Sequence, residues 1–210
     1  MLLTELEVEP PAARALFGER IAVAREYVGH LSDLGEKLGL IGPRELPRLW
    51  TRHILNSALV APLLKRGVVG DVGSGAGLPG IVLAIARPDV DFVLIEPMER
   101  RVAWLTEESQ RLQLENVKVV HSRAEEAPFA RELDQVTARA VSALSKLIPM
   151  CAPLARRGGE LIFLKGENVS AEVESAAKAI RKAHLRDAEV VVLGDGMVQE
   201  ITRVFRATVD

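Results

Sequence analysis

The stretch VVGDVGSGAGLPGIVLAI, residues 68–85, decides the fold of this chain. It begins with a short β-branched run that Gly70 and Asp71 interrupt, continues with closely spaced glycines, and ends in an apolar segment compatible with a helix. This order predicts a strand, a glycine-rich loop and a helix. Glycine lets the backbone approach a ligand closely, and a helix N-terminus can aim free N–H groups at it. The loop is therefore the first candidate for a nucleotide-like cofactor site.

Two cofactor classes fit the spacing of these glycines. Gly75, Gly77 and Gly80 match the G-x-G-x-x-G pattern of dinucleotide sites. Gly73, Gly75 and Gly77 match the alternative pattern G-x-G-x-G. The pattern alone does not choose between them, and a purely structural glycine turn is a third interpretation.

Two acidic residues beside the loop favour one of these classes. Glu96 follows the glycines at the distance where an acidic side chain holds a ribose, and it suits either cofactor. Asp71 precedes the first loop glycine, and its carboxylate would repel a pyrophosphate but attract the ammonium group of a methionine moiety. We therefore interpret the cofactor as S-adenosylmethionine.

Length and composition indicate one soluble globular unit. The chain has 210 residues, of which 48% are hydrophobic and 27% are charged, so it can bury one core but not two full α/β domains. No apolar run reaches the roughly 18 residues that a membrane span needs. The N-terminus, MLLTELEVEPP, is acidic and lacks the basic region of a signal peptide. We expect a cytoplasmic protein, and a monomer.

Cysteine, histidine and net charge exclude several function classes. Cys151 is the only cysteine, so an intramolecular disulfide and a multi-cysteine zinc site are impossible. The four histidines show no H-x-x-x-H spacing, and we assign no metal. The net charge of −2 gives no overall attraction to nucleic acid, so any RNA contact must come from local clusters of Lys and Arg.

Residues 1–66 are predicted to form a helical cap, and residues 67–210 one compact catalytic unit. Apolar residues recur at helical spacing from Leu16 to Leu38, after Pro10 and Pro11, and predict a first helix with one face toward a core. A second helix is predicted over residues 47–65.

The second predicted helix carries a candidate RNA-binding face. Arg48 and Arg52 lie four residues apart and could meet phosphates together, with His53 beside them. A solvated helix face is the competing interpretation for the arginines, and an interface histidine for His53.

From residue 68 onward, short apolar runs alternate with helical patterns. Strands are predicted at residues 68–72, 92–96, 116–121, 134–140 and 160–165, and helices at 98–114, 145–156 and 170–183. Such alternation predicts an α/β fold with a doubly wound, mainly parallel sheet. Two final β-type runs, residues 185–193 and 198–208, flank a Gly194–Gly196 turn and predict an antiparallel hairpin. A parallel sheet closed in this way is typical of the Rossmann-like fold of class I S-adenosylmethionine-dependent methyltransferases.

Ligands of such sheets bind beyond the carboxyl ends of the strands, which marks several residues as candidates. Glu96 could accept hydrogen bonds from ribose hydroxyls, and Ala124 with Glu125 could recognise adenine. Their competing interpretations are helix-capping carboxylates. Lys165 and Arg203 could line a positively charged entry for RNA.

Arg139, at the end of the fourth predicted strand, is the most informative of the strand-end candidates. No Asn/Asp-Pro-Pro-aromatic run for amine methylation stands there, and Cys151 lies too far along to be a pyrimidine nucleophile. What remains is an acceptor with a free lone pair, such as guanine N7. An arginine can also bind a phosphate or a guanine edge in bidentate fashion, while a structural ion pair is its competing interpretation.

These motifs together resemble the RsmG/GidB family of bacterial 16S rRNA methyltransferases over nearly the whole chain. The matching segments are RHILNS (residues 52–57), DVGSGAGLPG (71–80), Glu96, RAEE (123–126), ARA (138–140), LKG (164–166) and Arg203 of ITRVF. The family commonly has Asp where Asn56 stands here.

The resemblance implies methyl transfer from S-adenosylmethionine to N7 of guanine 527 in 16S rRNA, in the small subunit or its precursor. It further implies that loss of the modification gives low-level streptomycin resistance. By position it implies cofactor contacts from five residues: Gly73, Leu78, Ala124, Glu125 and Arg139. Catalytic roles for Arg139 and Lys165 follow from the strand-end argument.

Three other functions stay open from the residues alone. A nicotinamide-dependent oxidoreductase could use Gly75, Gly77 and Gly80, although no paired acid for hydride transfer is visible. An RNA-binding or assembly factor could keep the cofactor pocket without turnover. A small-molecule methyltransferase is the nearest rival, and the basic helical extension disfavours it.

Overall fold

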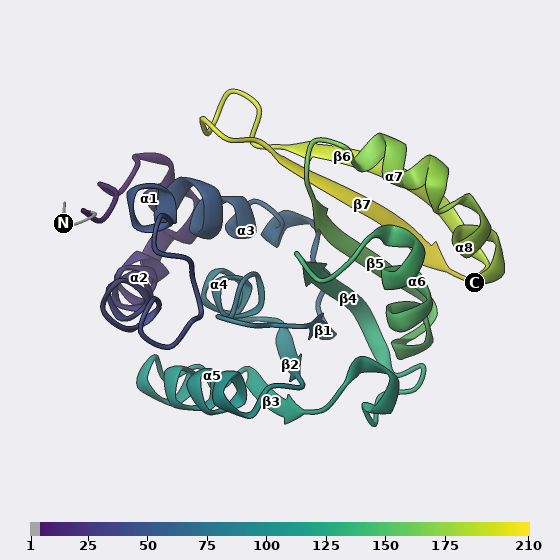
Figure 1. Ribbon diagram of the computed structural model, residues 1–210, viewed down its shortest axis with the longest axis horizontal. Helices are drawn as coiled ribbons and strands as arrows, with labels where there is room; N and C mark the ends of the chain where they lie inside the picture. Colours follow the sequence, from purple (N-terminus) through teal and green to yellow (C-terminus); the bar gives the residue numbers. More distant parts are fainter. Residues whose placement is uncertain (1–4) are drawn as a thin grey trace.

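The computed structural model describes residues 5–210. Met1–Thr4, which belong to the expected helical cap and to the acidic N-terminal stretch, lie outside the described residues. The described chain forms a seven-stranded sheet in the order β3-β2-β1-β4-β5-β7-β6 (Figure 1). Its strands are β1 (Val68–Val72), β2 (Asp91–Glu96), β3 (Val117–His121), β4 (Leu133–Arg139), β5 (Ala155–Lys165), β6 (Leu185–Leu193) and β7 (Thr202–Val209).

The sheet is parallel from β3 to β5 and antiparallel at its far edge. Strand β1 pairs in parallel with β2 and β4, whereas β7 lies between β5 and β6 and runs antiparallel to both. This confirms the predicted mainly parallel sheet with a closing hairpin. The predicted tight turn is wrong, because β7 begins only at Thr202 and residues 194–201 form a longer connection.

Helices cover both faces of the sheet, as Figure 1 shows. Helices α4 (Gly80–Ala86) and α5 (Glu99–Arg111) lie on one face with the N-terminal helices. Helices α6 (Leu144–Cys151), α7 (Val169–Ser175) and α8 (Ala177–Lys182) lie on the other. Side chains alternate along each strand, so Ile162 enters the core on the first face and Phe163 the core on the second. The strands thus meet apolar cover on both sides and end at one shared edge.

The first part of the helical cap is α1 (Ala12–Phe17), a short 3₁₀ turn η1 (Gly18–Arg20) and α2 (Ile21–Leu34). The apolar stripe of α2 is buried at Tyr27, Val28 and Leu31, as helical spacing predicts. The stripe does not continue to Leu38, which is 42% exposed. The helix ends before Gly35, where a Cβ would come within 2.4 Å of the Leu31 carbonyl oxygen.

The second predicted helix is an irregular segment, because its hydrogen-bond pattern changes three times. It consists of η2 (Leu46–Arg48), a π-helix η3 (Leu49–Leu55), one α-turn α3 (Asn56–Ala58) and η4 (Ala61–Leu63). The prediction of one regular helix over residues 47–65 was wrong, although most of these residues lie in short helical pieces. A π-helix widens the turn and is frequent at functional sites.

Other predicted boundaries moved by a few residues. Helix α6 ends at Cys151, and β5 begins at Ala155, so Gly158 and Gly159 lie inside a strand next to a register irregularity. The predicted helix over residues 170–183 is divided at Ala176 into α7 and α8. Across residues 5–210, every helix is too short or too polar to span a bilayer.

Candidate active site

The loop between β1 and α4 is shaped by glycines with left-handed backbone. Gly73, Gly75 and Gly77 have φ angles of +69°, +58° and +100°. A Cβ at Gly77 would lie 2.4 Å from the Ile81 side chain, whereas the nearest atom to a Cβ at Gly75 would be 3.7 Å away. The loop is therefore tight against α4 at Gly77 and open at Gly75, which suits a small-molecule cradle.

Asp71 fastens this loop from within the core. Its side chain is fully buried, and its carboxylate accepts hydrogen bonds from Gly80 N (3.0 Å) and Thr137 Oγ1 (3.1 Å). The Ser74 hydroxyl donates to the Asp71 carbonyl oxygen at 2.8 Å. Burial raises the pKa of the Asp71 carboxyl to about 6. The observed contacts of Asp71 are thus all within the protein, and its direct attraction of a cofactor stays a prediction.

The first two N–H groups of α4 are engaged within the protein. Gly80 donates its N–H to Asp71, Ile81 donates to the Gly77 carbonyl at 2.8 Å, and Pro79 has no N–H. The expected free N–H groups at the helix start are therefore not supplied by Gly80 or Ile81. A pyrophosphate needs those donors, so the geometry disfavours a dinucleotide as the cofactor. Of the two cofactors, the residues present fit S-adenosylmethionine better.

Glu96 lies at the carboxyl end of β2, directly beside the loop. Its side chain is buried, and its two oxygens accept hydrogen bonds from Gly75 N and Met98 N, both at 2.9 Å. Each carboxylate oxygen keeps a second lone pair, so Glu96 could also accept from a ribose. The turn η5 (Ala124–Glu126) follows β3, the strand that pairs with β2. In this turn Ala124 is buried and Glu125 is exposed.

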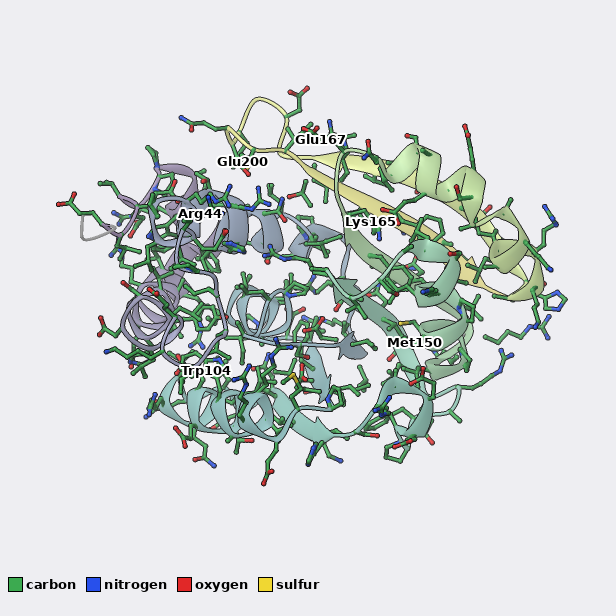
Figure 2. All side chains as sticks on the ribbon, in the orientation of Figure 1. Arg44, Trp104, Met150, Lys165, Glu167 and Glu200 are labelled. Carbon is green, nitrogen blue, oxygen red and sulfur yellow. The ribbon has the colours of Figure 1, made fainter. Side chains whose placement is uncertain are left out.

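Two aromatic side chains that sequence reasoning missed hold the loop from outside. The Ala76 carbonyl accepts hydrogen bonds from Tyr27 Oη (2.9 Å) on α2 and from Trp104 Nε1 (2.8 Å) on α5. Figure 2 labels Trp104 on α5. A signal existed, because the chain contains one tyrosine and two tryptophans, and such side chains seek a partner for their polar tip when buried.

Arg139, at the end of β4, reaches the irregular helical segment. Its guanidinium donates hydrogen bonds to the Arg52 carbonyl (3.2 Å), to Asn56 Oδ1 (3.4 Å) and to His53 Nδ1. Leu78, another predicted contact, is buried in the loop. The structure thus brings Arg139 together with the RHILNS segment, which the sequence did not predict.

Lys165 is engaged inside the protein. Its ammonium group lies 2.7 Å from Glu172 on α7 and 3.0 Å from the Ser142 carbonyl oxygen. Glu172 also accepts from Leu144 N at 3.1 Å, so these contacts fix the connection after β4. Lys165 ends β5, where Figure 2 labels it, and its expected catalytic and RNA-binding roles stay predictions.

The predicted RNA-binding residues are divided between exposed and buried positions. Arg48 and Arg52 have side chains 42% and 49% exposed, and both approach Glu45, at 2.7 and 3.7 Å. Arg203 on β7 is half-buried and pairs in register with Lys165. The His53 side chain is only 12% exposed, which disfavours it as a direct RNA contact.

The relatives of this chain agree with the geometry. A family model described as GidB, rRNA small subunit methyltransferase G, matches residues 20–202. A protein named Ribosomal RNA small subunit methyltransferase G from Clavibacter sepedonicus is 65% identical over 98% of both chains. A protein of the same name from Leifsonia xyli subsp. xyli is 64% identical over 97% of this chain and 98% of its own.

A solved structure with similar architecture supports the fold. A SAM-dependent methyltransferase from Aquifex aeolicus aligns with a TM-score of 0.59 and 19% identity, covering 83% of this chain and 98% of its own. The predicted class I methyltransferase fold is confirmed by this likeness and by the observed strand order. The chain belongs to the GidB family of rRNA small subunit methyltransferases.

Proposed function

We propose that this protein transfers the methyl group of S-adenosylmethionine to N7 of a guanine in 16S rRNA, at position 527. The family and the names of its members support rRNA of the small subunit as the substrate. One observation carries the choice of cofactor: the carboxylates of Asp71 and Glu96 occupy N–H groups of the loop that a pyrophosphate would need. A loop built on carboxylates suits a cationic ligand.

The strand-end residues have complementary roles in this proposal. S-adenosylmethionine supplies an electrophilic methyl group on a sulfonium when it is bound. Glu96 would accept hydrogen bonds from its ribose, and the turn at Ala124 and Glu125 would border its adenine. Arg139 would stand where the methyl group and the purine meet, at the end of the strand next to β1.

The states of Cys151 and His53 support an acceptor with a free lone pair. Burial raises the pKa of the Cys151 thiol, and the side chain is fully buried, so it cannot act as a nucleophile toward a base. His53 has both ring nitrogens in hydrogen bonds with protein groups. Guanine N7 needs neither deprotonation nor covalent activation, and alignment of the two reactants supplies the main contribution to rate.

RNA would approach over the exposed arginines of the irregular segment. Arg48 and Arg52 are nearly half exposed, although the net charge of the chain is −2. Arg203 and Lys165 would border the same entry from the paired ends of β7 and β5. Extrusion of the target guanine from its stack would be required for N7 to reach the methyl group in line.

A transfer assay with identified product tests this proposal. Purified protein is incubated with methyl-labelled S-adenosylmethionine and small subunits from a strain that lacks the protein, and the rRNA is digested to nucleosides. We expect the label in 7-methylguanosine at one site. Label in any other nucleoside would refute the N7 assignment, and no label with either subunits or free 16S rRNA would refute the activity.

A further inference from the structure

Three side chains form a continuous line from the helical cap into the candidate active site. Glu45 Oε2 lies 2.6 Å from His53 Nε2, and His53 Nδ1 meets the Arg139 guanidinium. Glu45 precedes η2, His53 lies on the π-helix η3, and Arg139 ends β4. The line therefore joins segments that are far apart in the sequence.

The partners of His53 fix its tautomer. A guanidinium can only donate hydrogen bonds, so His53 Nδ1 must be the acceptor toward Arg139. A carboxylate can only accept, so His53 Nε2 must carry the proton that is donated to Glu45. The line is consistent only with a neutral imidazole protonated on Nε2. A proton added to Nδ1 would break the contact with Arg139.

The surroundings of His53 keep it neutral. Burial and the positive charge of Arg139 lower the pKa of His53 to about 4, against the opposing effect of Glu45. Arg52 is the other nearby cation, and it acts in the same direction as Arg139. Burial opposes the shift, but hydrogen bonds from Arg48 and His53 to the Glu45 carboxylate lower its pKa to about 2. Both groups therefore hold one protonation state through the neutral pH range.

The π-helix η3 and the first residue of α3 add further acceptors for the same guanidinium. Arg139 Nη1 lies 3.2 Å from the Arg52 carbonyl oxygen and 3.4 Å from Asn56 Oδ1. Because η3 has the wider π-helical turn, the backbone around Arg52 and His53 departs from α-helical geometry where Arg139 arrives. Asn56 supplies a neutral side-chain acceptor to this guanidinium.

We propose that Glu45 and His53 are positioning residues that hold Arg139 in its working orientation, so the helical cap completes the active site. The inference rests on the proposed function, since it assigns Arg139 to methyl transfer. It replaces the earlier prediction that His53 contacts RNA. His53 touches no substrate in this account, and it acts through the acceptor that it offers to Arg139.

Two substitutions of His53 separate positioning from RNA binding. His53→Asn keeps an acceptor close to the place of Nδ1, whereas His53→Leu removes it. His30→Leu is the matched control, because His30, which is also in the cap, forms a similar pair with Glu108 on α5 (2.8 Å) and contacts none of the three residues. Each variant is compared with wild type in kinetics on small subunits, and its folding is checked by thermal unfolding.

The expected kinetic result is a selective loss. His53→Leu should lower kcat/KM for S-adenosylmethionine by roughly 10- to 100-fold, the range for a lost hydrogen bond to a charged group. The KM for the subunit should change by less than about twofold, and His53→Asn should restore most of the rate, as expected of an acceptor role. Full activity of folded His53→Leu would overturn the proposal, as would an equal rise in the subunit KM for both variants.

Nuclear magnetic resonance tests the Glu45–His53–Arg139 contacts through the tautomer of His53, independently of enzyme activity. In protein labelled with ¹⁵N-histidine, His53 should be neutral and protonated on Nε2 throughout pH 6–8. Arg139→Ala should raise its titration midpoint, because a neighbouring positive charge is lost. A wild-type His53 protonated on Nδ1, or one that titrates near its ordinary pKa, would overturn the proposal even if the enzyme is active. An inactive wild type with the expected spectrum would instead count against the proposed function.

Discussion

Arg139 is the residue on which the proposed transfer depends most. It meets four acceptor atoms on the RHILNS segment while standing at the end of β4. Arg139→Ala removes all of these contacts, and we expect a loss of roughly 10- to 100-fold or more in transfer to small subunits. Arg25→Ala is a suitable control, because Arg25 forms an exposed pair with Glu9 in the cap, far from this cluster in sequence. Wild-type turnover by a folded Arg139→Ala protein would show that the site is misplaced.

Asp71 gives the stability of the protein a distinctive dependence on pH. Its folded pKa of about 6 lies above its ordinary value of 3.8, so the folded state binds the proton more tightly than the unfolded chain. The stabilisation is present at low pH and is lost as the pH rises through about 6. Between pH 5 and pH 8 the change is on the order of 1 kcal/mol. Thermal unfolding at both pH values measures it.

A substitution isolates this contribution. Asp71→Asn cannot ionise, yet an amide can still accept from Gly80 N and donate to the Thr137 hydroxyl. We expect its free energy of unfolding to lose the part of the pH dependence that Asp71 contributes. Asp89→Asn is the control, since the pKa of Asp89 is lowered to about 2 and the group stays ionised in both states across this range. An unchanged pH dependence in Asp71→Asn would contradict the account of the loop.

At the residue scale, the sequence predicted where candidate residues lie in the fold better than it predicted their hydrogen-bond and ion-pair partners. The spacing of Gly73, Gly75 and Gly77 after a strand located the loop, and Glu96 was correctly placed beside it. The partners of Asp71 and Lys165 were not predictable, because they depend on which side chains the fold brings across the sheet. Glu45 gave no signal, since an acidic residue among arginines is common on any solvated surface.

Among the elements, the two helices that clamp the loop make a testable pair. Tyr27 on α2 and Trp104 on α5 both donate to the Ala76 carbonyl. Tyr27→Phe alone should cost about 0.5–1.5 kcal/mol, because one donor remains, and Trp104→Phe should cost more, because the smaller ring also leaves a cavity. The double variant leaves a buried carbonyl without either donor, so its cost should exceed the sum of the single costs.

Chemical denaturation of the wild type, the two single variants and the double variant measures how far the two stability costs depart from additivity. Calorimetry of S-adenosylmethionine binding shows whether the loop is affected. We expect the weakest cofactor binding in the double variant. Strictly additive stabilities together with unchanged cofactor binding would show that the two aromatic side chains do not support the loop as a pair.

Regular elements were predictable and irregular ones were not. Short apolar runs predicted the strands, because both faces of the sheet are buried, and a helical pattern predicted α5. The π-helix at Leu49–Leu55 keeps apolar spacing close to that of an α-helix, so periodicity could not distinguish the two. The break at Ala176 between α7 and α8 likewise has no glycine or proline to mark it.

The whole molecule combines a nearly neutral chain with a local concentration of arginines at one edge of the sheet. Arg48 and Arg52 are exposed there, and Arg139 lies behind them. The buried cluster on the first sheet face includes apolar residues of the cap and of β1, β2, β5 and β7. This shared core supports our proposal that the cap is part of the working enzyme, while the boundary between cap and catalytic unit near residue 66 stays a prediction.

The central claim is that this chain places one methyl group on guanine N7 in 16S rRNA, and nucleoside mass spectrometry of that rRNA tests it most directly. The rRNA is compared between a strain that lacks the protein, the same strain with the wild-type chain restored, and the same strain with Arg139→Ala. We predict that one 7-methylguanosine, at position 527, is missing without the protein, returns with wild type, and stays largely absent with the variant. An unchanged 7-methylguanosine content in the strain that lacks the protein would contradict the account.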